Sequence, residues 1–241
     1  MTAAPPFDVD YHVHSVFSDD AHSTLAENVR AARERGLRTV CLAEHVRRDS
    51  GQVPRFTAAV AALPPVPGLR VLAGVEAKIL DTSGRLDLPA ALPGIDLVLI
   101  ADHQFPGPAG PRGPGEMRDA LGRGEVSVTE AVGWLAEATA AALGQAERVS
   151  LAHLFSILPK VGLTERAMPD RVLGHLARRA RAAGALVEVN EKWGCPSARS
   201  LRAFADAGVR VVASTDSHHC SSVGVYRRAR RILGRAAGAR G

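Results

Sequence analysis

The stretch VDYHVH at residues 9–14 has an apolar start and ends in a His-x-His pair, and SDDAH follows it at residues 18–22. Successive side chains of an extended strand point to opposite faces, so His12 and His14 share one face. Both imidazoles can therefore reach a single metal ion. A His-x-His pair alone is a weak signal, and its weight depends on what recurs along the chain.

The composition predicts one domain that spans residues 1–241. The chain is 46% hydrophobic, which is enough for one sizeable core. No apolar run approaches the roughly 20 residues of a membrane span, so we expect no membrane partner. The N-terminus has neither a basic head nor an apolar signal core. Three cysteines without a CxxC pair indicate reduced thiols. We therefore expect a cytoplasmic protein.

The basic residues leave two interpretations of the net charge of +5. Their densest cluster is YRRARRIL at residues 226–233, where the spacing is helical. It is either the solvated face of a terminal helix or a patch for nucleic acid or another acidic partner. Aromatic content of 4% leaves few platforms for base stacking. The first interpretation is favoured, and nucleic acid is not an expected partner.

Alternating strand and helix patterns run through the chain. Seven β-like runs are expected at residues 7–12, 39–45, 70–79, 96–103, 149–154, 185–190 and 210–216. Helical patterns lie between them at residues 25–35, 55–63, 128–143, 170–183 and 197–207. Such alternation predicts an α/β fold with parallel strands and right-handed crossovers. Segment 104–125 is rich in glycine and proline, and we expect a long loop there. It is either a substrate lid or a mobile loop without a role.

Metal-ligating residue types occur at the ends of the strands. They are His12, His45, Glu76, His103, His153 and Asp216, with His218 just beyond the last strand. The C-terminal ends of parallel strands share one face of an α/β fold, and active sites are built there. We therefore expect these residues to converge on one pocket.

Nine residues are candidate metal ligands: His12, His14, Asp20, His45, Glu76, His103, His153, Asp216 and His218. Imidazole and carboxylate suit zinc, manganese and iron(II). Nine ligands exceed the needs of one ion, so two or three divalent ions and a bridging carboxylate are expected. Ions roughly 3.5–4 Å apart can clamp the attacking and leaving oxygens of a displacement at phosphorus. They also lower the pKa of a bridging water, which yields a hydroxide nucleophile.

Seven short motifs follow one another along the chain: HVH (12–14), SDD (18–20), AEH (43–45), GVE (74–76), ADH (101–103), LAH (151–153) and STDSH (214–218). Through these motifs and their order, the chain resembles the PHP (polymerase and histidinol phosphatase) metal-dependent phosphoesterases over nearly its whole length. The small histidinol-phosphatase-like branch fits the length best. The resemblance implies a distorted (β/α)7 TIM-like barrel with its active site at the C-terminal ends of the strands.

The resemblance also implies three ion positions. The first is held by His12, His14, Glu76 and Asp216. The second shares Glu76 and adds His103 and His153, and the third uses Asp20, His45 and His218. Asp19 and His22 remain alternatives to Asp20. Glu44 stands where the family usually has Asp before His45, which puts the orientation of the neighbouring ligands in doubt.

The implied activity is hydrolysis of a small phosphomonoester by a metal-bridging hydroxide. Glu76, Asp216 and His218 are the expected catalytic residues, and Asp216 or His218 would assist the leaving alcohol. L-histidinol phosphate is the first named substrate. A cyclic phosphodiesterase, a 3′/5′ exonuclease and a non-catalytic metal-binding module are the alternatives. The complete ligand set favours an enzyme over the module, and the oligomeric state stays open.

A phosphate substrate also needs cations. Lys160 and Lys192 follow the fifth and sixth strands, in loops where histidinol-phosphatase-like relatives carry basic residues, and they are the expected phosphate anchors. The fallback anchors are Arg47, Arg48 and Arg199. Glu188 and Asn190 close the sixth strand, where they contact either the substrate or the metal ligands, or simply line the pocket.

Overall fold

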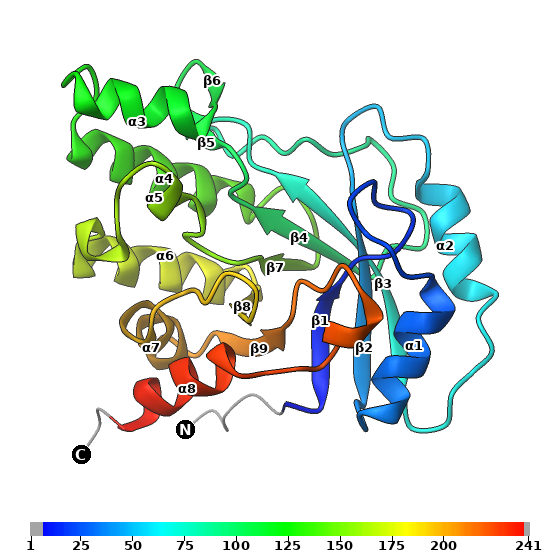
Figure 1. The fold of residues 1–241 in the computed structure, drawn as a ribbon. Helices are drawn as coiled ribbons and strands as arrows, with labels where there is room; N and C mark the ends of the chain where they lie inside the picture. Colours follow the sequence, from blue (N-terminus) through cyan, green and yellow to red (C-terminus); the bar gives the residue numbers. More distant parts are fainter. Residues whose placement is uncertain (1–6, 239–241) are drawn as a thin grey trace.

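A curled, seven-stranded parallel sheet forms the centre of the computed structural model, which describes residues 7–238 (Figure 1). Its order is β1-β2-β3-β4-β7-β8-β9. The strands are Val9–Val13 (β1), Thr39–His45 (β2), Arg70–Lys78 (β3), Leu97–Ala101 (β4), Val149–Leu151 (β7), Leu186–Asn190 (β8) and Arg210–Ser214 (β9). All six neighbouring pairs in this order are parallel. The seven strands confirm the predicted alternation.

The strands end close to the expected residues, and β2 has the expected bounds. β7 and β9 stop earlier than the sequence pattern predicts, at Leu151 and Ser214. Residues just beyond them take left-handed backbone conformations, with φ of 28° at His153 and 54° at Asp216. Such values interrupt an extended strand. The chain therefore turns at the points where the candidate ligands are presented.

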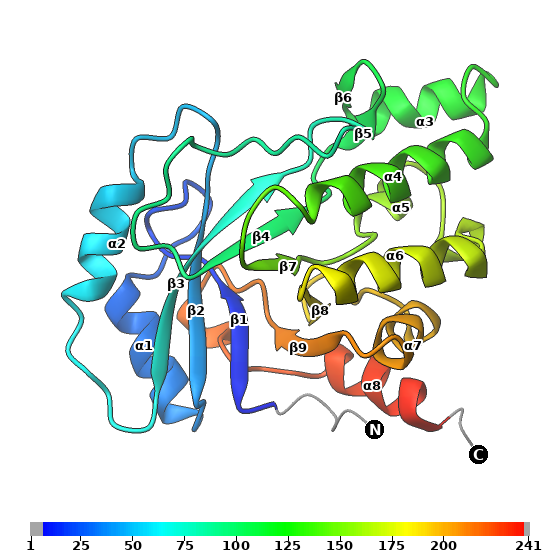
Figure 2. The same ribbon diagram turned by 180° about the vertical axis from the view of Figure 1, so that it is seen from behind.

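Helices cover the outside of the curled sheet (Figures 1 and 2). They are Leu25–Glu34 (α1), Val53–Ala61 (α2), Pro114–Gly122 (α3), Val128–Ala142 (α4), Ile157–Lys160 (α5), Asp170–Ala182 (α6), Ala198–Asp206 (α7) and Arg228–Gly238 (α8). Two 3-10 turns lie at Glu165–Ala167 and Cys220–Ser222. Capping boxes begin α1 at Thr24 and α4 at Ser127. In the described part of the chain, we find no helix with the length and apolarity needed to cross a membrane.

The expectation of a long loop at residues 104–125 is wrong. The segment contains an antiparallel hairpin, Phe105–Gly107 (β5) and Gly110–Arg112 (β6), followed by α3. Phe105 and Met117 are fully buried in the main core. The glycines and prolines that suggested a loop instead form a tight turn and place Pro114 at the start of a helix, where proline is well tolerated.

The barrel closes between β1 and β9 largely through one buried side chain. The Asp10 carboxylate accepts hydrogen bonds from Thr215 N at 2.9 Å, Thr215 Oγ1 at 2.5 Å and Gly224 N at 2.9 Å. In the turn beyond β9, His14 N donates to Ser217 O at 2.8 Å and Ser217 N donates to His12 O at 3.3 Å. Burial raises the pKa of Asp10 to about 6 in spite of these donors. The closure brings His12 and His14 beside Asp216.

Candidate metal centre

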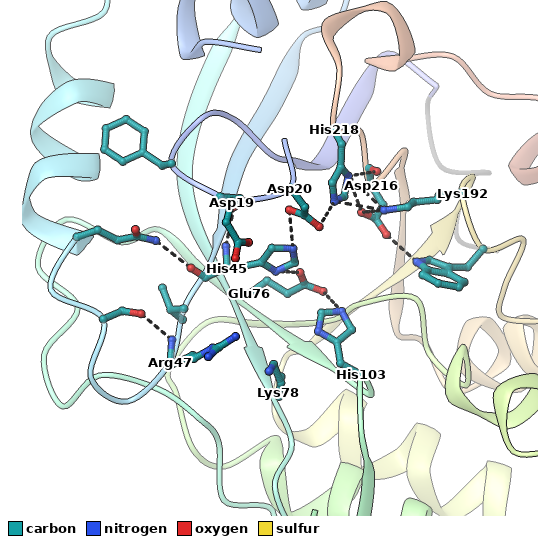
Figure 3. Close-up of a pocket in the computed structure, with 16 residues that line it drawn as sticks. Asp19, Asp20, His45, Arg47, Glu76, Lys78, His103, Lys192, Asp216 and His218 are labelled. Atoms are coloured by element: carbon teal, nitrogen blue, oxygen red, sulfur yellow. Dashed lines mark hydrogen bonds and ion pairs between the residues drawn. The ribbon is translucent and has the colours of Figure 1, made fainter. Parts of the chain in front are cut away.

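Glu76, near the end of β3, lies at the centre of the predicted ligands (Figure 3). Its Oε1 is 2.8 Å from His153 Nε2 and 3.1 Å from His103 Nε2. Its Oε2 is 2.9 Å from His45 Nδ1, 3.5 Å from His12 Nε2 and 3.6 Å from His14 Nε2. One carboxylate thus faces five imidazoles from the ends of four strands, β1, β2, β4 and β7. The convergence expected from the strand ends is present.

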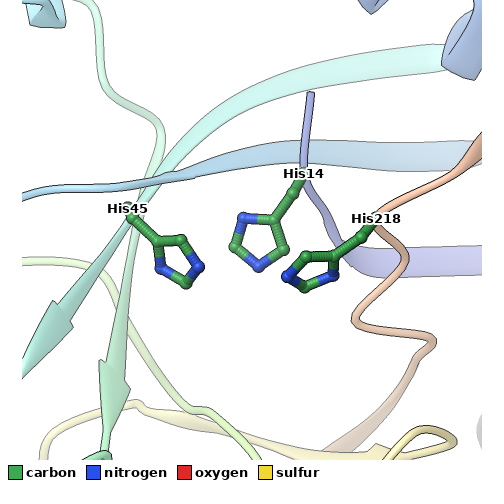
Figure 4. Close-up of side chains that lie close together, drawn as sticks. All are labelled: His14, His45 and His218. Carbon is green, nitrogen blue, oxygen red and sulfur yellow. The ribbon is translucent and has the colours of Figure 1, made fainter. Parts of the chain in front are cut away.

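Three groups of side chains could each hold an ion. They are His12, His14 and Asp216; His45, Glu76 and His103; and His14, His45 and His218 (Figure 4). Within each group the candidate ligand atoms lie within 4.8 Å of one another. Each group overlaps one of the three predicted ion positions. His45 is shared between the second and third groups, although only the third position was expected to use it.

Asp20 lies beside the third group. Its Oδ1 is 3.4 Å from His45 Nε2, and its Oδ2 is 3.1 Å from His218 Nε2. Asp19 and Asp20 line one cavity, which opens over these residues. His22 is exposed and donates its backbone N–H to the His218 carbonyl at 2.9 Å. This geometry favours Asp20 among the three alternatives, and its ligation stays a prediction.

The donor atoms fit a cation. Glu76 Oε2 is buried and has no hydrogen-bond donor among the described residues, although three ring nitrogens lie near it. His12 Nε2 and His14 Nε2 are 3.0 Å apart and face each other. Lone pairs that point into one shared space suit a bound divalent ion, and imidazole with carboxylate suits zinc, manganese or iron(II).

Buried carboxylates contact the Nδ1 atoms of His12 and His153, on the side of each ring away from Glu76. Glu188 Oε2 is 3.2 Å from His12 Nδ1, and Glu188 Oε1 accepts hydrogen bonds from the His153 N–H and from Asn190 Nδ2. Asp102 Oδ1 is 3.4 Å from His153 Nδ1. These acids fix Nδ1 of each ring and leave Nε2 facing Glu76, which is how metal-binding histidines are usually oriented. Glu188 therefore contacts two candidate ligands, one of the roles anticipated for it, whereas Asn190 contacts Glu188.

Burial and charge set the protonation of the centre. Burial, together with the neighbouring His12 and His45, lowers the pKa of His14 to about 3, so this ring is neutral at pH 7. Burial alone would raise the pKa of Glu76, but the facing His103 and His12 outweigh it and hold the pKa below the usual range. A neutral imidazole and an ionised carboxylate are the forms that bind metal ions. In contrast, nearby carboxylates outweigh burial and raise the pKa of His12, and that of His153 to about 10, so these two rings would lose a proton when a cation binds.

Asp216 is held by the loop that follows β8. Its Oδ2 accepts a hydrogen bond from Trp193 Nε1 at 2.8 Å, and its Oδ1 lies 3.4 Å from Lys192 Nζ and 3.5 Å from His14 Nε2. Although burial would raise it, the pKa of Asp216 is held below its usual range chiefly by His12. Trp193 therefore turns one oxygen of Asp216 toward the imidazoles.

A cavity of about 480 Å³, which we call the metal pocket, opens over the cluster. Its wall includes Phe17, Asp19, Asp20, His45, Arg47, Ser50, Gln52, Glu76, Lys78, His103, Lys192, Trp193, Asp216 and His218 (Figure 3). No described residue of segment 104–125 lines it, which gives no support to a lid there.

The predicted phosphate anchors occupy different places. Lys192 lines the metal pocket, with Nζ 3.2 Å from His218 Nδ1. Lys160 lies in a neighbouring cavity of about 900 Å³, where its Nζ is 4.1 Å from the centre of the Trp193 ring. Phosphate binding by either lysine stays a prediction.

The three fallback arginines also differ. Arg47 lines the metal pocket, and neither Arg48 nor Arg199 is among its lining residues. Arg199 donates to Asp170 and to the carbonyl oxygens of Glu165 and Met168.

Comparison with known proteins agrees with this geometry. A family model for the PHP domain matches residues 10–153, which is more than half of the chain. The chain belongs to the PHP domain family. A probable phosphatase of Vibrio vulnificus strain YJ016 is 39% identical over 100 residues, and one of Thermoanaerobacter strain X514 is 35% identical over 98 residues. These matches cover 40% and 39% of this chain and 40% of each relative, so the chain matches well under half of their length.

Two solved structures share the fold. Histidinol phosphate phosphatase of Lactococcus lactis, complexed with zinc, L-histidinol and phosphate, superposes with a TM-score of 0.67 at 19% identity over 95% of this chain and 93% of that one. A putative histidinol phosphatase of Listeria monocytogenes gives 0.66 at 14% identity over 90% of this chain and 97% of that one. The predicted PHP-type (β/α)7 barrel is confirmed.

Glu44, the departure from the usual PHP motif, is accommodated by serines. It accepts hydrogen bonds from Ser15 Oγ at 2.6 Å and Ser18 Oγ at 2.7 Å, and Ser18 Oγ accepts the His45 N–H at 3.0 Å. The longer side chain thus ties the loop that carries Asp20 to the end of β2. The doubt about orientation is answered by these contacts.

Sequence reasoning missed three residues at this site. Asp102 stood inside a quoted motif, directly before His103, and its position was the available signal. Lys78 lies two residues after Glu76 and hence on the same face of β3, which could have placed it in the pocket. Trp193 follows Lys192 in a loop whose path no local pattern predicts.

Proposed function

We propose that this protein is a metal-dependent phosphoesterase that hydrolyses a small phosphomonoester. The observation that carries the proposal is the convergence of five imidazoles on Glu76 beneath a pocket lined by cationic side chains. The names of the relatives as probable phosphatases agree with it.

Two or three divalent ions, zinc, manganese or iron, would be held by the three groups described above. When bound in such a site, they lower the pKa of water toward neutrality and neutralise charge on a phosphoryl group. The zinc in the Lactococcus lactis structure supports this choice of cofactor.

The protein's own side chains would bind and orient the substrate. Lys192 Nζ, at the edge of the cluster, can donate to a phosphoryl oxygen. His218 is at the mouth of the pocket, where Asp20 contacts its Nε2 at 3.1 Å and orients the ring. In that position the imidazole can deliver a proton to the leaving alcohol. Asp216, the other residue named for this role, is kept ionised by its lowered pKa, so it would hold a cation rather than donate a proton.

The pocket favours a small substrate. Its volume is about 480 Å³, and of its described residues only Phe17 and Trp193 bring rings other than imidazole. An exonuclease would need a longer groove with more stacking platforms. L-histidinol phosphate is the first substrate to test, since the Lactococcus lactis structure holds L-histidinol and phosphate.

The test is a substrate panel. Metal-stripped protein is reloaded with Mn²⁺ or Zn²⁺ and given p-nitrophenyl phosphate, L-histidinol phosphate, a cyclic phosphate and a short oligonucleotide. We expect metal-dependent phosphate release from the monoesters and a loss of at least roughly 10³-fold in His12→Ala. His175→Ala, on the exposed side of α6, is the matched control and should retain activity.

The alternatives predict different results. Faster cleavage of the oligonucleotide or of the cyclic phosphate would favour the corresponding phosphodiesterase. A folded, metal-loaded protein that is inert toward every ester would favour a non-catalytic module.

A further inference from the structure

Two cationic side chains line the metal pocket at a distance from Lys192. Arg47 follows β2, and Lys78 is the last residue of β3. Figure 3 shows both on one side of the His45–Glu76–His103 group, with Lys192 on the other side. The pocket therefore has cations at two separate positions.

The geometry of β3 fixes Lys78 in the pocket. Glu76 and Lys78 are two residues apart on one strand, so they project from the same face. The strand is paired through this point, with Glu76 opposite Leu99 and Lys78 opposite Ala101. Asp87 N donates to Lys78 O at 2.9 Å and holds the strand end. These contacts fix the backbone that carries the Lys78 side chain, which is half-buried.

The two positions differ in how their charges are paired. Lys192 lies 3.4 Å from the Asp216 carboxylate. Within residues 7–238, neither Arg47 nor Lys78 forms an ion pair with a carboxylate. The first turn of α2 adds positive potential, since the residue before it, Gln52, lines the pocket and its side chain does not cap the helix. Asp19 also lines the pocket, and within residues 7–238 it forms no ion pair with Arg47 or Lys78.

We propose that Arg47 and Lys78 bind a second negative group, a carboxylate or a phosphate, on the alcohol part of the substrate. This inference rests on the proposed phosphoesterase function and narrows its substrate class to phosphomonoesters with an anionic leaving alcohol. A planar guanidinium and an ammonium are well suited to such groups. The ammonium of L-histidinol would be repelled at this position, so L-histidinol phosphate is not the preferred substrate.

Binding of phosphonates tests the proposal without turnover. Propylphosphonate carries one anionic group, whereas 3-phosphonopropionate and propane-1,3-bisphosphonate carry a second group as carboxylate or phosphonate. Calorimetry on the Mn²⁺-loaded protein gives the ratio of their affinities. We expect at least one of the two ligands with a second anionic group to bind roughly tenfold more tightly than propylphosphonate, because a charge-assisted contact is added. Whichever arm is tighter identifies the second group as carboxylate or phosphate.

Variants assign the preference to residues. In Lys78→Met and in Arg47→Met the ratio should fall below about threefold, while Lys78→Arg should retain most of it. Arg55→Met, an exposed arginine on α2 outside the pocket, is the matched control and should leave the ratio unchanged.

Three results would overturn the proposal. One is a wild-type ratio near one for both arms, and another is a ratio that survives both methionine variants. The third is an equal loss of affinity for all three ligands in Lys78→Met, which would place Lys78 at the transferred phosphoryl group. These binding measurements involve no catalysis. If the affinity ratio is as expected but the protein hydrolyses no ester, only the phosphoesterase function is contradicted.

Discussion

The inner and outer ends of the metal centre are built differently. At the inner end, His12, Glu76 and His153 are almost fully buried, and Glu188 supports both histidines. At the outer end, the side chains of His45, His218 and Asp20 are 29%, 17% and 54% exposed. Packing and buried acids fix the inner geometry, whereas the outer geometry depends on loops and mutual contacts. An ion at the inner end should therefore bind more tightly than one at the outer end.

The largest effect is expected for Glu76→Gln. The substitution keeps the size of the side chain but removes the charge that faces five imidazoles. Metal content, measured by elemental analysis, should fall at both ends, and activity should fall by at least roughly 10³-fold. Glu137→Gln on the exposed face of α4 serves as the control. Full metal content in the Glu76 variant would contradict a shared central carboxylate.

Glu188→Gln should have the next largest effect, confined to the inner end. The amide can no longer hold Nδ1 of His12 as a carboxylate does, and we expect roughly 10–100-fold weaker metal binding. Competition with a chelator measures the affinity, and Glu137→Gln is again the control. Unchanged affinity would mean that packing alone orients His12.

Asp20→Asn should have a smaller effect, since the residue is exposed and acts only at the outer end. We expect activity to fall roughly fivefold to tenfold, with at most one ion lost and the inner affinity retained. Titration of metal into metal-stripped protein distinguishes binding at the inner end from binding at the outer end. Loss of every ion would show that the ends are not independent.

The smallest effect is expected for Trp193→Phe, which keeps an aromatic side chain but removes the indole N–H that donates to Asp216. Loss of one such hydrogen bond costs about 1 kcal/mol, or roughly fivefold in metal affinity. Trp134→Phe on α4 is the matched control, because it is the other tryptophan of the chain and lies outside the metal pocket. An equal change in both variants would point to general destabilisation.

The inner end was the more predictable from the sequence. Buried parallel strands read as apolar runs, and a histidine or carboxylate where such a run stops is visible without a structure, as at Glu76 and His153. The C-terminal ends of parallel strands lie on one face of the fold, so these residues are brought together. The place where the candidate ligands gather could thus be predicted together with the fold.

The remaining features depend on contacts that leave no local pattern. Glu188 reaches His12 across 176 residues, and Trp193 reaches Asp216 from an irregular loop. Segment 104–125 has loop-like composition, yet burial of Phe105 and Met117 orders it. Tertiary packing overrides local propensity in such cases.

The seam at Asp10 has a consequence for biosynthesis. Its partners Thr215 and Gly224 lie more than 200 residues away, so the barrel can close only after β9 has left the ribosome. Asp216 and His218 arrive with the same segment. A nascent chain that ends before residue 215 would expose an unpaired carboxylate at an open edge and hold an incomplete set of ligands. Completion of the candidate ligand set is thereby coupled to closure of the barrel.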